Sequence, residues 1–391
     1  MTSTNASPPA LSTTATASEP LRDALKRLAR GTEKDLSALL YDVERHVVVD
    51  GTNVTAHCHC LTLDGNGRPR IEDLVEGVAE HVLDYAIPRS EYRTAEDEAR
   101  RTGSHQKIAR LYTKARQLFT DLVQSGEGGE LLLFALAEKL LRLPQLICKM
   151  SLKTNTRMHI HGADGLHAGV DEKTGKLLLY WGESKIFSDV TSAVRDCLAS
   201  LAPMLQNHEA SKRDLQLLQR HLDVDNDELE EALKKFLNPD DPEFNALEFR
   251  GLCLVGFDFD AYPSEGPSRV ELKTIVKAIV EALPKWKEHL VKRIFEEKLD
   301  AFSMHFLFVP FPSADNFRRL FREHLGLNKA LRNDEPEASG THPMPTTTAS
   351  TAASLRLSAN STSRAKPRTG PLSVSQRVHA SKAKRSPRGA P

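Results

Sequence analysis

Apolar residues follow two spacings along the chain, one typical of helices and one typical of strands. Positions three and four apart predict amphipathic helices, whereas short continuous or alternating apolar runs predict strands. The expected helices are 21–30, 71–83, 105–123, 128–143, 190–205, two within 214–237, 270–299 with a break or kink at Pro284, and 314–325. The expected strands are 46–50, 54–63, 146–150, two forming a hairpin around 171–176, 251–259 and 304–309. Residues 91–103 are expected to be a helix or a loop.

The hairpin around 171–176 carries charged side chains on both of its strands. Its polar turn precedes the apolar run 177–181, and pairing about that turn places Asp164 opposite Glu183. Glu183 and Lys185 are two residues apart, so they project to the same side of a strand. The hairpin therefore gathers two carboxylates and an amine, and a shared site requires Asp164 to point the same way as Glu183 and Lys185.

These residue types suit metal-dependent hydrolysis of a phosphodiester. The carboxylates of Asp164 and Glu183 suit Mg²⁺, with Mn²⁺ as the alternative ion, because Mg²⁺ binds one or two carboxylates and keeps several waters. A bound metal ion lowers the pKa of a water molecule and neutralises charge on the phosphate. Lys185 would orient that water or stabilise the developing charge. The alternative is a charged surface hairpin without a catalytic role.

Other triplets of the same type have weaker settings. Glu271-Leu-Lys273 and Glu296-Glu-Lys298 lie in an expected helix, where residues two apart do not share a face. Asp171-Glu-Lys173 lies in the turn. Only Glu183-Ser-Lys185 follows an apolar run and has an Asp on the preceding strand, so it is the candidate motif.

Several short segments, in a fixed order, carry a resemblance to a known family. They are Gly126-Glu-Gly-Gly-Glu130, Leu146-Ile-Cys-Lys-Met150, Gly162-Ala-Asp-Gly-Leu-His167, Gly182-Glu-Ser-Lys185, Leu252-Cys-Leu-Val-Gly-Phe-Asp258, Phe308-Val-Pro-Phe-Pro-Ser313 and Phe317-Arg-Arg-Leu-Phe-Arg322. From about Leu40 to Leu327 the chain resembles the HamA family, the nuclease subunit of the bacterial Hachiman antiphage defence system. The resemblance implies a PD-(D/E)xK nuclease fold and a helicase partner, HamB. The family motif falls on Asp164, Glu183 and Lys185, with Ala163 in place of the proline in the motif's name.

The order of elements predicts the fold class and the domains. Helix, strand, hairpin, helix, strand is the order of a restriction-endonuclease-like core, an α/β (α+β) fold with a mixed central sheet flanked by helices. We expect a disordered segment at 1–20, a strand-hairpin and helical part of the same module at 21–103, the nuclease-like domain with helical C-terminal additions at 104–330, and a disordered basic tail at 331–391.

A further carboxylate is expected to come from the helix that precedes the hairpin. In restriction-endonuclease-like cores the first helix often contributes a carboxylate to the metal site. Glu130, near the N-terminus of its helix, is the candidate, and Glu127 is the second choice. The alternative for both is that they favour the positive end of the helix dipole.

Composition is consistent with a soluble cytoplasmic enzyme. No apolar run approaches the length of a membrane span, and residues 1–18 lack the apolar core of a secretory signal. Five cysteines, an odd number, suit free thiols in a reducing compartment.

The formal net charge of zero conceals a basic tail. Residues 341–391 contain nine Lys and Arg and no Asp or Glu, so the rest of the chain carries 44 basic and 53 acidic residues. The tail is either a tether to the nucleic-acid backbone or a dispensable extension. The chain is therefore expected to be a metal-dependent DNA endonuclease of antiphage defence, controlled by a helicase. The alternative is a catalytically inactive module that binds a helicase partner or DNA.

Overall fold

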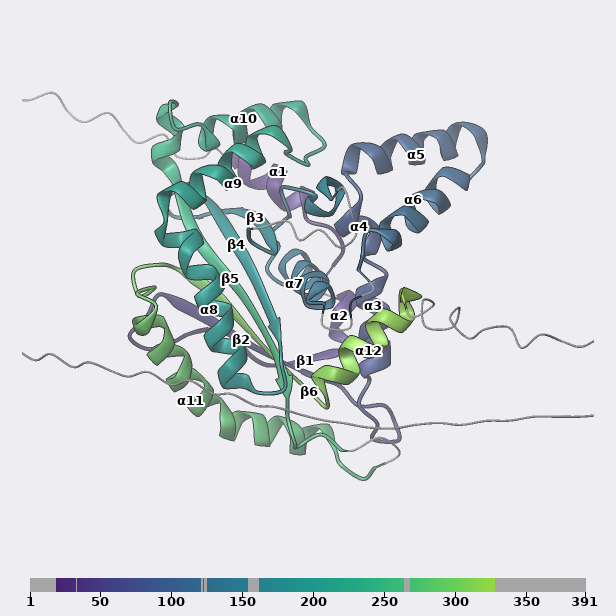
Figure 1. The fold of residues 1–391 in the computed structure, drawn as a ribbon, viewed down its shortest axis with the longest axis vertical. Helices are drawn as coiled ribbons and strands as arrows, with labels where there is room; N and C mark the ends of the chain where they lie inside the picture. Colours follow the sequence, from purple (N-terminus) through teal and green to yellow (C-terminus); the bar gives the residue numbers. More distant parts are fainter. Residues whose placement is uncertain are drawn as a thin grey trace, which may run out of the picture. The chain divides into compact units, whose positions relative to one another are not determined.

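The computed structural model describes residues 19–32, 34–120, 122, 125–153, 162–263 and 268–327 (Figure 1). All of them belong to one compact unit. Residues 1–18 and the basic tail 331–391, both expected to be disordered, lie outside the described residues. None of the described helices is both long enough and apolar enough to cross a membrane.

A mixed sheet of six strands forms the centre of the described chain, in the order β1-β2-β6-β5-β4-β3. Strands β2, β6, β5 and β4 are parallel, and the edge strands β1 and β3 pair antiparallel with their neighbours. This arrangement confirms the predicted mixed sheet. The strands are β1 Leu40–Val48, β2 Val54–Leu61, β3 Gly165–Val170, β4 Leu177–Ile186, β5 Leu247–Asp258 and β6 Met304–Phe311.

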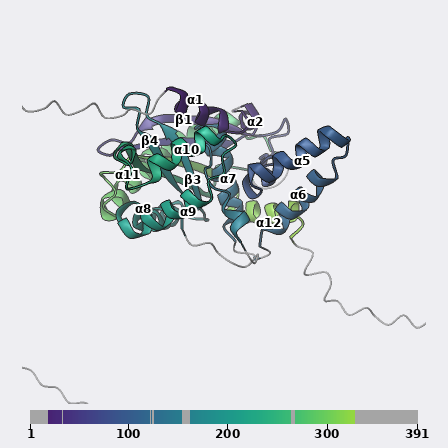
Figure 2. The same ribbon diagram turned by 90° about the horizontal axis from the view of Figure 1, so that it is seen from above.

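Helices flank the sheet on both faces. Helices α8 and α11 cover one face, where α8 packs on β4 and β5, while α7 packs on the same strands from the other side (Figures 1 and 2). The helices are α1 Glu19–Leu28, α2 Lys34–Ser37, α3 Ile71–Ala79, α4 Val82–Ala86, α5 Arg89–Thr102, α6 Gln106–Gln117, α7 Glu127–Lys139, α8 Val190–Gln206, α9 His208–Arg220, α10 Asp227–Leu237, α11 Leu272–Glu296 and α12 Ala314–His324.

The most buried elements are those that position the candidate motif. Strand β4 is buried along nearly its whole length because helices cover both of its faces, which explains its continuous apolar run. Helix α7 is likewise apolar nearly all round. Gly129 allows the first turn of α7 to approach β4 closely, since a Cβ there would lie 3.2 Å from Ser184 Oγ.

One predicted element was wrong. Residues 146–150 are not a strand: one isolated bridge joins Gln145 to His167, and the chain then enters a 3-10 helix, η1 Lys149–Leu152. Of the break or kink expected at Pro284, the structure excludes the break, because helix α11 runs through this residue. Because proline has no backbone N–H, the carbonyl of Val280, four residues earlier, lacks its usual helical donor. Both Pro284 and Val280 lie on the exposed side of the helix, so water can bond this carbonyl instead. Residues 91–102 are helical, and Gly103 ends this helix in a left-handed conformation.

Candidate active site

The register of the β3–β4 hairpin agrees with the register expected from the sequence. Gly165 pairs with Gly182 and Leu166 with Trp181, so the next residues outward are Asp164 and Glu183. The turn contains Gly175 with φ +68°, a conformation that glycine adopts without strain. The hairpin therefore brings Asp164 to the Glu183-Ser-Lys185 triplet.

The carboxylate of Asp164 is fixed by Ser184, the middle residue of that triplet. Asp164 Oδ2 accepts hydrogen bonds from Ser184 N and from Ser184 Oγ, both at 2.8 Å. Strand β3 begins at Gly165, so Asp164 lies just before it. The Asp164 carboxylate accepts a hydrogen bond from the backbone N–H of Ser184, which a β3 strand starting earlier would have bonded with its own backbone. Asp164 therefore lies beside Ser184 at the edge of the sheet, rather than on the face that carries Glu183.

Glu183 and Lys185 project together toward α8. Lys185 Nζ donates a hydrogen bond to Glu183 Oε1, and Ser200 of α8 also hydrogen-bonds the Glu183 carboxylate. Burial and the nearby charge of Asp164 raise the pKa of Glu183 to about 7, against the opposing effect of Lys185. Burial lowers the pKa of Lys185, but the carboxylates of Glu183 and Asp164 raise it overall, so Lys185 remains protonated.

Glu130 reaches the same region from α7. It lies one turn into the helix, and its Oε2 accepts a hydrogen bond from Tyr85 Oη at 2.9 Å. Burial and the charge of Asp164 raise the pKa of Glu130 to about 8, although Lys149 and the Tyr85 hydroxyl oppose this shift. Asp164 thus interacts electrostatically with Glu130 on one side and with Glu183 on the other.

Lys149 supplies a buried positive charge beneath this group. Its Nζ donates a hydrogen bond to the carbonyl of Ala163, the residue before Asp164, and its charge lowers the pKa of Glu130. Lys149 begins the 3-10 helix η1, in the segment that the sequence wrongly indicated to be a strand. The local turn, rather than an extended strand, is what directs this lysine toward the carboxylates.

Glu127, the second choice on α7, has a structural environment. Its Oε1 forms a buried ion pair with Lys153 Nζ at 2.5 Å, and its Oε2 accepts a hydrogen bond from Thr120 N at 2.7 Å. Both carboxylate oxygens are therefore engaged in holding the segment before α7 against the segment after it. Of the two glutamates, Glu130 is the one close to Asp164.

The structure brings Asp164 within electrostatic reach of Glu130, Glu183 and Lys185, but it does not place all four side chains on one face of the sheet. Glu183 and Lys185 project toward α8, whereas Asp164 is bonded to Ser184 and Glu130 comes from α7. The shared orientation that the sequence analysis required of Asp164 is therefore not found. Sequence reasoning missed three neighbours that hold them, namely Tyr85, Lys149 and Ser184. Ser184 is the middle residue of the triplet and Lys149 lies in a family segment, so both had a signal in the sequence. Tyr85 had none, because its contact with Glu130 depends on how α4 packs against α7.

The cysteines do not contribute to this centre. All five, Cys58, Cys60, Cys148, Cys197 and Cys253, are buried free thiols, as expected from their odd number. Cys197 of α8 lies closest, with its Sγ 3.4 Å from the backbone carbonyl of Glu183. Burial raises the pKa of the Cys197 thiol well above its usual value, so it is a packing residue and not a thiolate ligand.

Fold and side chains together define a mixed α/β protein with a cluster of carboxylates and lysines at one end of a central strand. A family model described as HamA matches residues 38–325. Because this match spans more than half of the chain, the chain belongs to the HamA family, and it is a component of Hachiman antiphage defence. The resemblance based on short segments is thereby confirmed. A comparison with curated proteins finds no match.

Proposed function

We propose that the protein is a metal-dependent DNA endonuclease, the effector of its antiphage defence system, under the control of a helicase partner. The observation that carries this proposal is the carboxylate cluster around Asp164. Glu130 and Glu183 both have raised pKa values because burial and the charge of Asp164 disfavour their ionised forms. The charges of Lys149 and Lys185 oppose these shifts without cancelling them, and strongly perturbed groups of this kind are typical of functional sites.

The donor set fits Mg²⁺ or Mn²⁺. Among the described residues, no three His, Cys, Asp or Glu side chains converge closely enough to enclose a metal ion unaided. Mg²⁺ does not require such a cage, because it usually takes one or two carboxylates and completes its shell with water and substrate phosphate. Asp164, through the carboxylate oxygen that does not bond Ser184, and Glu183 would hold the ion, with Glu130 next to Asp164. When bound, the ion would lower the pKa of a water molecule and neutralise charge on the phosphate.

Each remaining residue has a role that follows from its contacts. Lys185 stays protonated beside Glu183, so it can donate to a phosphate oxygen or to the attacking water as negative charge develops. Ser184 holds Asp164 in one orientation through two hydrogen bonds. Tyr85 and Lys149 fix Glu130 and the Ala163–Asp164 backbone. DNA as substrate and helicase control are supported by membership of the HamA family.

Digestion of supercoiled plasmid by the purified full chain tests the proposal. We expect nicking with Mg²⁺ or Mn²⁺ and none with EDTA, with and without the co-expressed helicase and ATP. Glu183→Gln should remove cleavage in both settings without lowering the melting temperature. If no condition yields metal-dependent cleavage and Glu183→Gln still protects cells from phage, the protein is instead a binding module whose hairpin is structural.

A further inference from the structure

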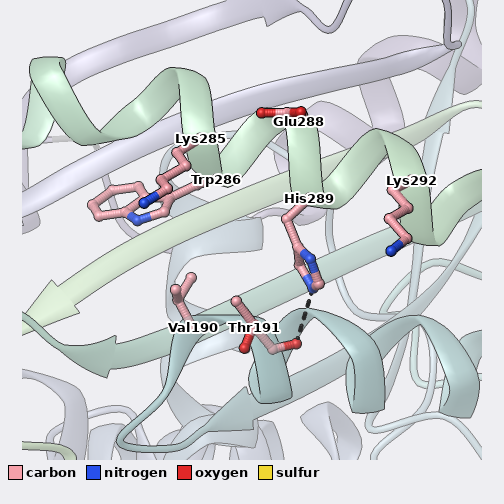
Figure 3. A pocket seen from close by; sticks show the side chains of 7 residues that line it. All are labelled: Val190, Thr191, Lys285, Trp286, Glu288, His289 and Lys292. Carbon is pink, nitrogen blue, oxygen red and sulfur yellow. Dashed lines mark hydrogen bonds between the residues drawn. The ribbon is translucent and has the colours of Figure 1, made fainter.

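A groove runs between the first turn of α8 and the middle of α11 (Figure 3). Its volume is about 520 Å³. The lining residues are Val190 and Thr191 of α8 and Lys285, Trp286, Glu288, His289 and Lys292 of α11. His289 Nε2 donates to the carbonyl of Thr191 across a distance of 3.2 Å, which fixes the separation of the two helices at this point.

The groove has an apolar floor that includes Val190 and Trp286, and two lysines, Lys285 and Lys292, at its α11 wall. Within the described part of the chain, Lys285 forms no ion pair, and Lys292 Nζ approaches only Glu296, at 3.9 Å. Glu288 is the one acidic lining residue, and in Figure 3 its side chain points away from α8. The N-terminus of α8 is already occupied by the Asp189 side chain, which accepts a hydrogen bond from Ser192 N. Any affinity of the groove for anions therefore comes from the lysines.

The groove lies on the same face of the sheet as Glu183 and Lys185. Both side chains project toward α8, and α8 begins five residues after Lys185. Five residues of extended chain span at most about 18 Å, so the α8 wall of the groove is within that distance of the Lys185 backbone. At 3.4 Å per nucleotide, this upper limit corresponds to about five nucleotides of DNA strand between Lys185 and the groove.

The spacing of the lysines matches the spacing of phosphates along a strand. Lys285 and Lys292 are seven residues apart on one helix, which is about 10 Å along its axis. This distance is about three nucleotides of a B-form strand. Both lysines therefore have the charge and the separation to contact one sugar-phosphate backbone at two points.

We propose that this groove binds the sugar-phosphate backbone of the DNA that flanks the cleaved bond. The inference rests on the proposed nuclease function, and it adds a substrate-binding surface separate from the metal centre. The reasons for preferring DNA to an acidic protein segment are the spacing of the two lysines and the short chain distance between the α8 wall of the groove and Lys185. Contacts to phosphate carry no sequence information, so the groove sets affinity and register and not base preference.

The test measures DNA binding rather than cleavage. The full chain in EDTA is titrated against a fluorescein-labelled 20-base-pair duplex at several salt concentrations. The groove variant is Lys285→Ala/Lys292→Ala. The matched control is Lys273→Ala/Lys277→Ala, which removes the same charge from the same helix. Lys273 and Lys277 lie outside the groove and already approach Glu271 and Glu281, at 2.5 and 3.9 Å.

We expect the groove variant to bind at least about tenfold more weakly at physiological salt. Its plot of log affinity against log salt should flatten by about two units, since each lost phosphate contact removes about 0.9. The control should keep the wild-type slope. Two results would overturn the proposal. One is that both variants weaken DNA binding equally. The other is that the groove variant binds DNA like the wild type but binds an acidic peptide more weakly than the wild type does. Because no cleavage is measured, an inactive metal centre would leave this result intact and count only against the nuclease.

Discussion

Replacement of Ser184 by alanine isolates the contact that orients Asp164. The change deletes the 2.8 Å hydrogen bond from Ser184 Oγ and leaves the bond from Ser184 N in place. A hydrogen bond to a charged acceptor contributes about 1.5–3 kcal/mol, which is about 10- to 150-fold in an equilibrium constant. Outer contacts of this kind typically alter metal affinity by about 10- to 100-fold. Ser184→Ala should therefore weaken metal binding without removing any reacting group.

The assay is the initial rate of plasmid nicking as a function of Mg²⁺ concentration. For Ser184→Ala we expect the half-saturating Mg²⁺ concentration to rise about 10- to 100-fold, while excess Mg²⁺ restores most of the maximal rate. Ser188→Ala is the matched control, because it removes the same atom from an exposed residue just beyond β4. An unchanged Mg²⁺ dependence in a folded Ser184→Ala protein would refute the role given to Asp164.

Three further predictions concern the surroundings of the site. Lys149→Met should lower the free energy of unfolding, measured with urea, by about 3 kcal/mol, because it leaves buried carboxylates uncompensated; no loss would contradict that role. Glu127→Gln should lower the stability of the protein but leave the rate of Mg²⁺-dependent cleavage per folded molecule unchanged. Glu130→Gln should lower that cleavage rate. Equal cleavage rates for the two variants would contradict the different roles given to the two glutamates. Burial lowers the pKa of His167 to about 4, so the unfolded chain takes up the proton first and stability falls as the pH drops below about 6.5. Between pH 7 and pH 5 the free energy of unfolding of the wild type, measured by urea titration, should fall by about 2 kcal/mol more than that of His167→Asn. Equal decreases in the two proteins would contradict this prediction.

The register of the motif hairpin was predictable because its determinants are local. A polar turn with a glycine and an apolar run on one side are enough to set which residues pair. The helix cap at Asp189, whose side chain accepts from Ser192 N, is a local feature of the same kind. The hairpin register depends on residues close together in the sequence, and the structure confirms it.

The orientation of Asp164 was not predictable for a physical reason. Side chains alternate between the two faces of a sheet only inside a strand. Strand β3 begins at Gly165, so Asp164 lies outside it. Beyond that point Asp164 follows its best hydrogen-bond donor, Ser184, instead of the pleat. The misassigned segment 146–150 has a similar cause, because the buried Lys149 finds its acceptor at Ala163 only after the chain turns.

Contacts between distant segments also could not be predicted from the sequence. Tyr85 and Glu130 are 45 residues apart, and nothing in either helix indicates that they meet. The groove between α8 and α11 likewise depends on tertiary packing, since its two walls are separated by β5 and two helices. Its lysines are ordinary members of an amphipathic helix until that packing is known.

Plasmid cleavage by the purified Glu183→Ala/Lys185→Ala variant tests the central claim most directly. Our account predicts that the variant folds, binds DNA like the wild type in EDTA, and gives no nicking above background at any Mg²⁺ or Mn²⁺ concentration. Retained metal-dependent nicking by that protein, purified free of host nucleases, would show that the cluster around Asp164 is not the catalytic centre.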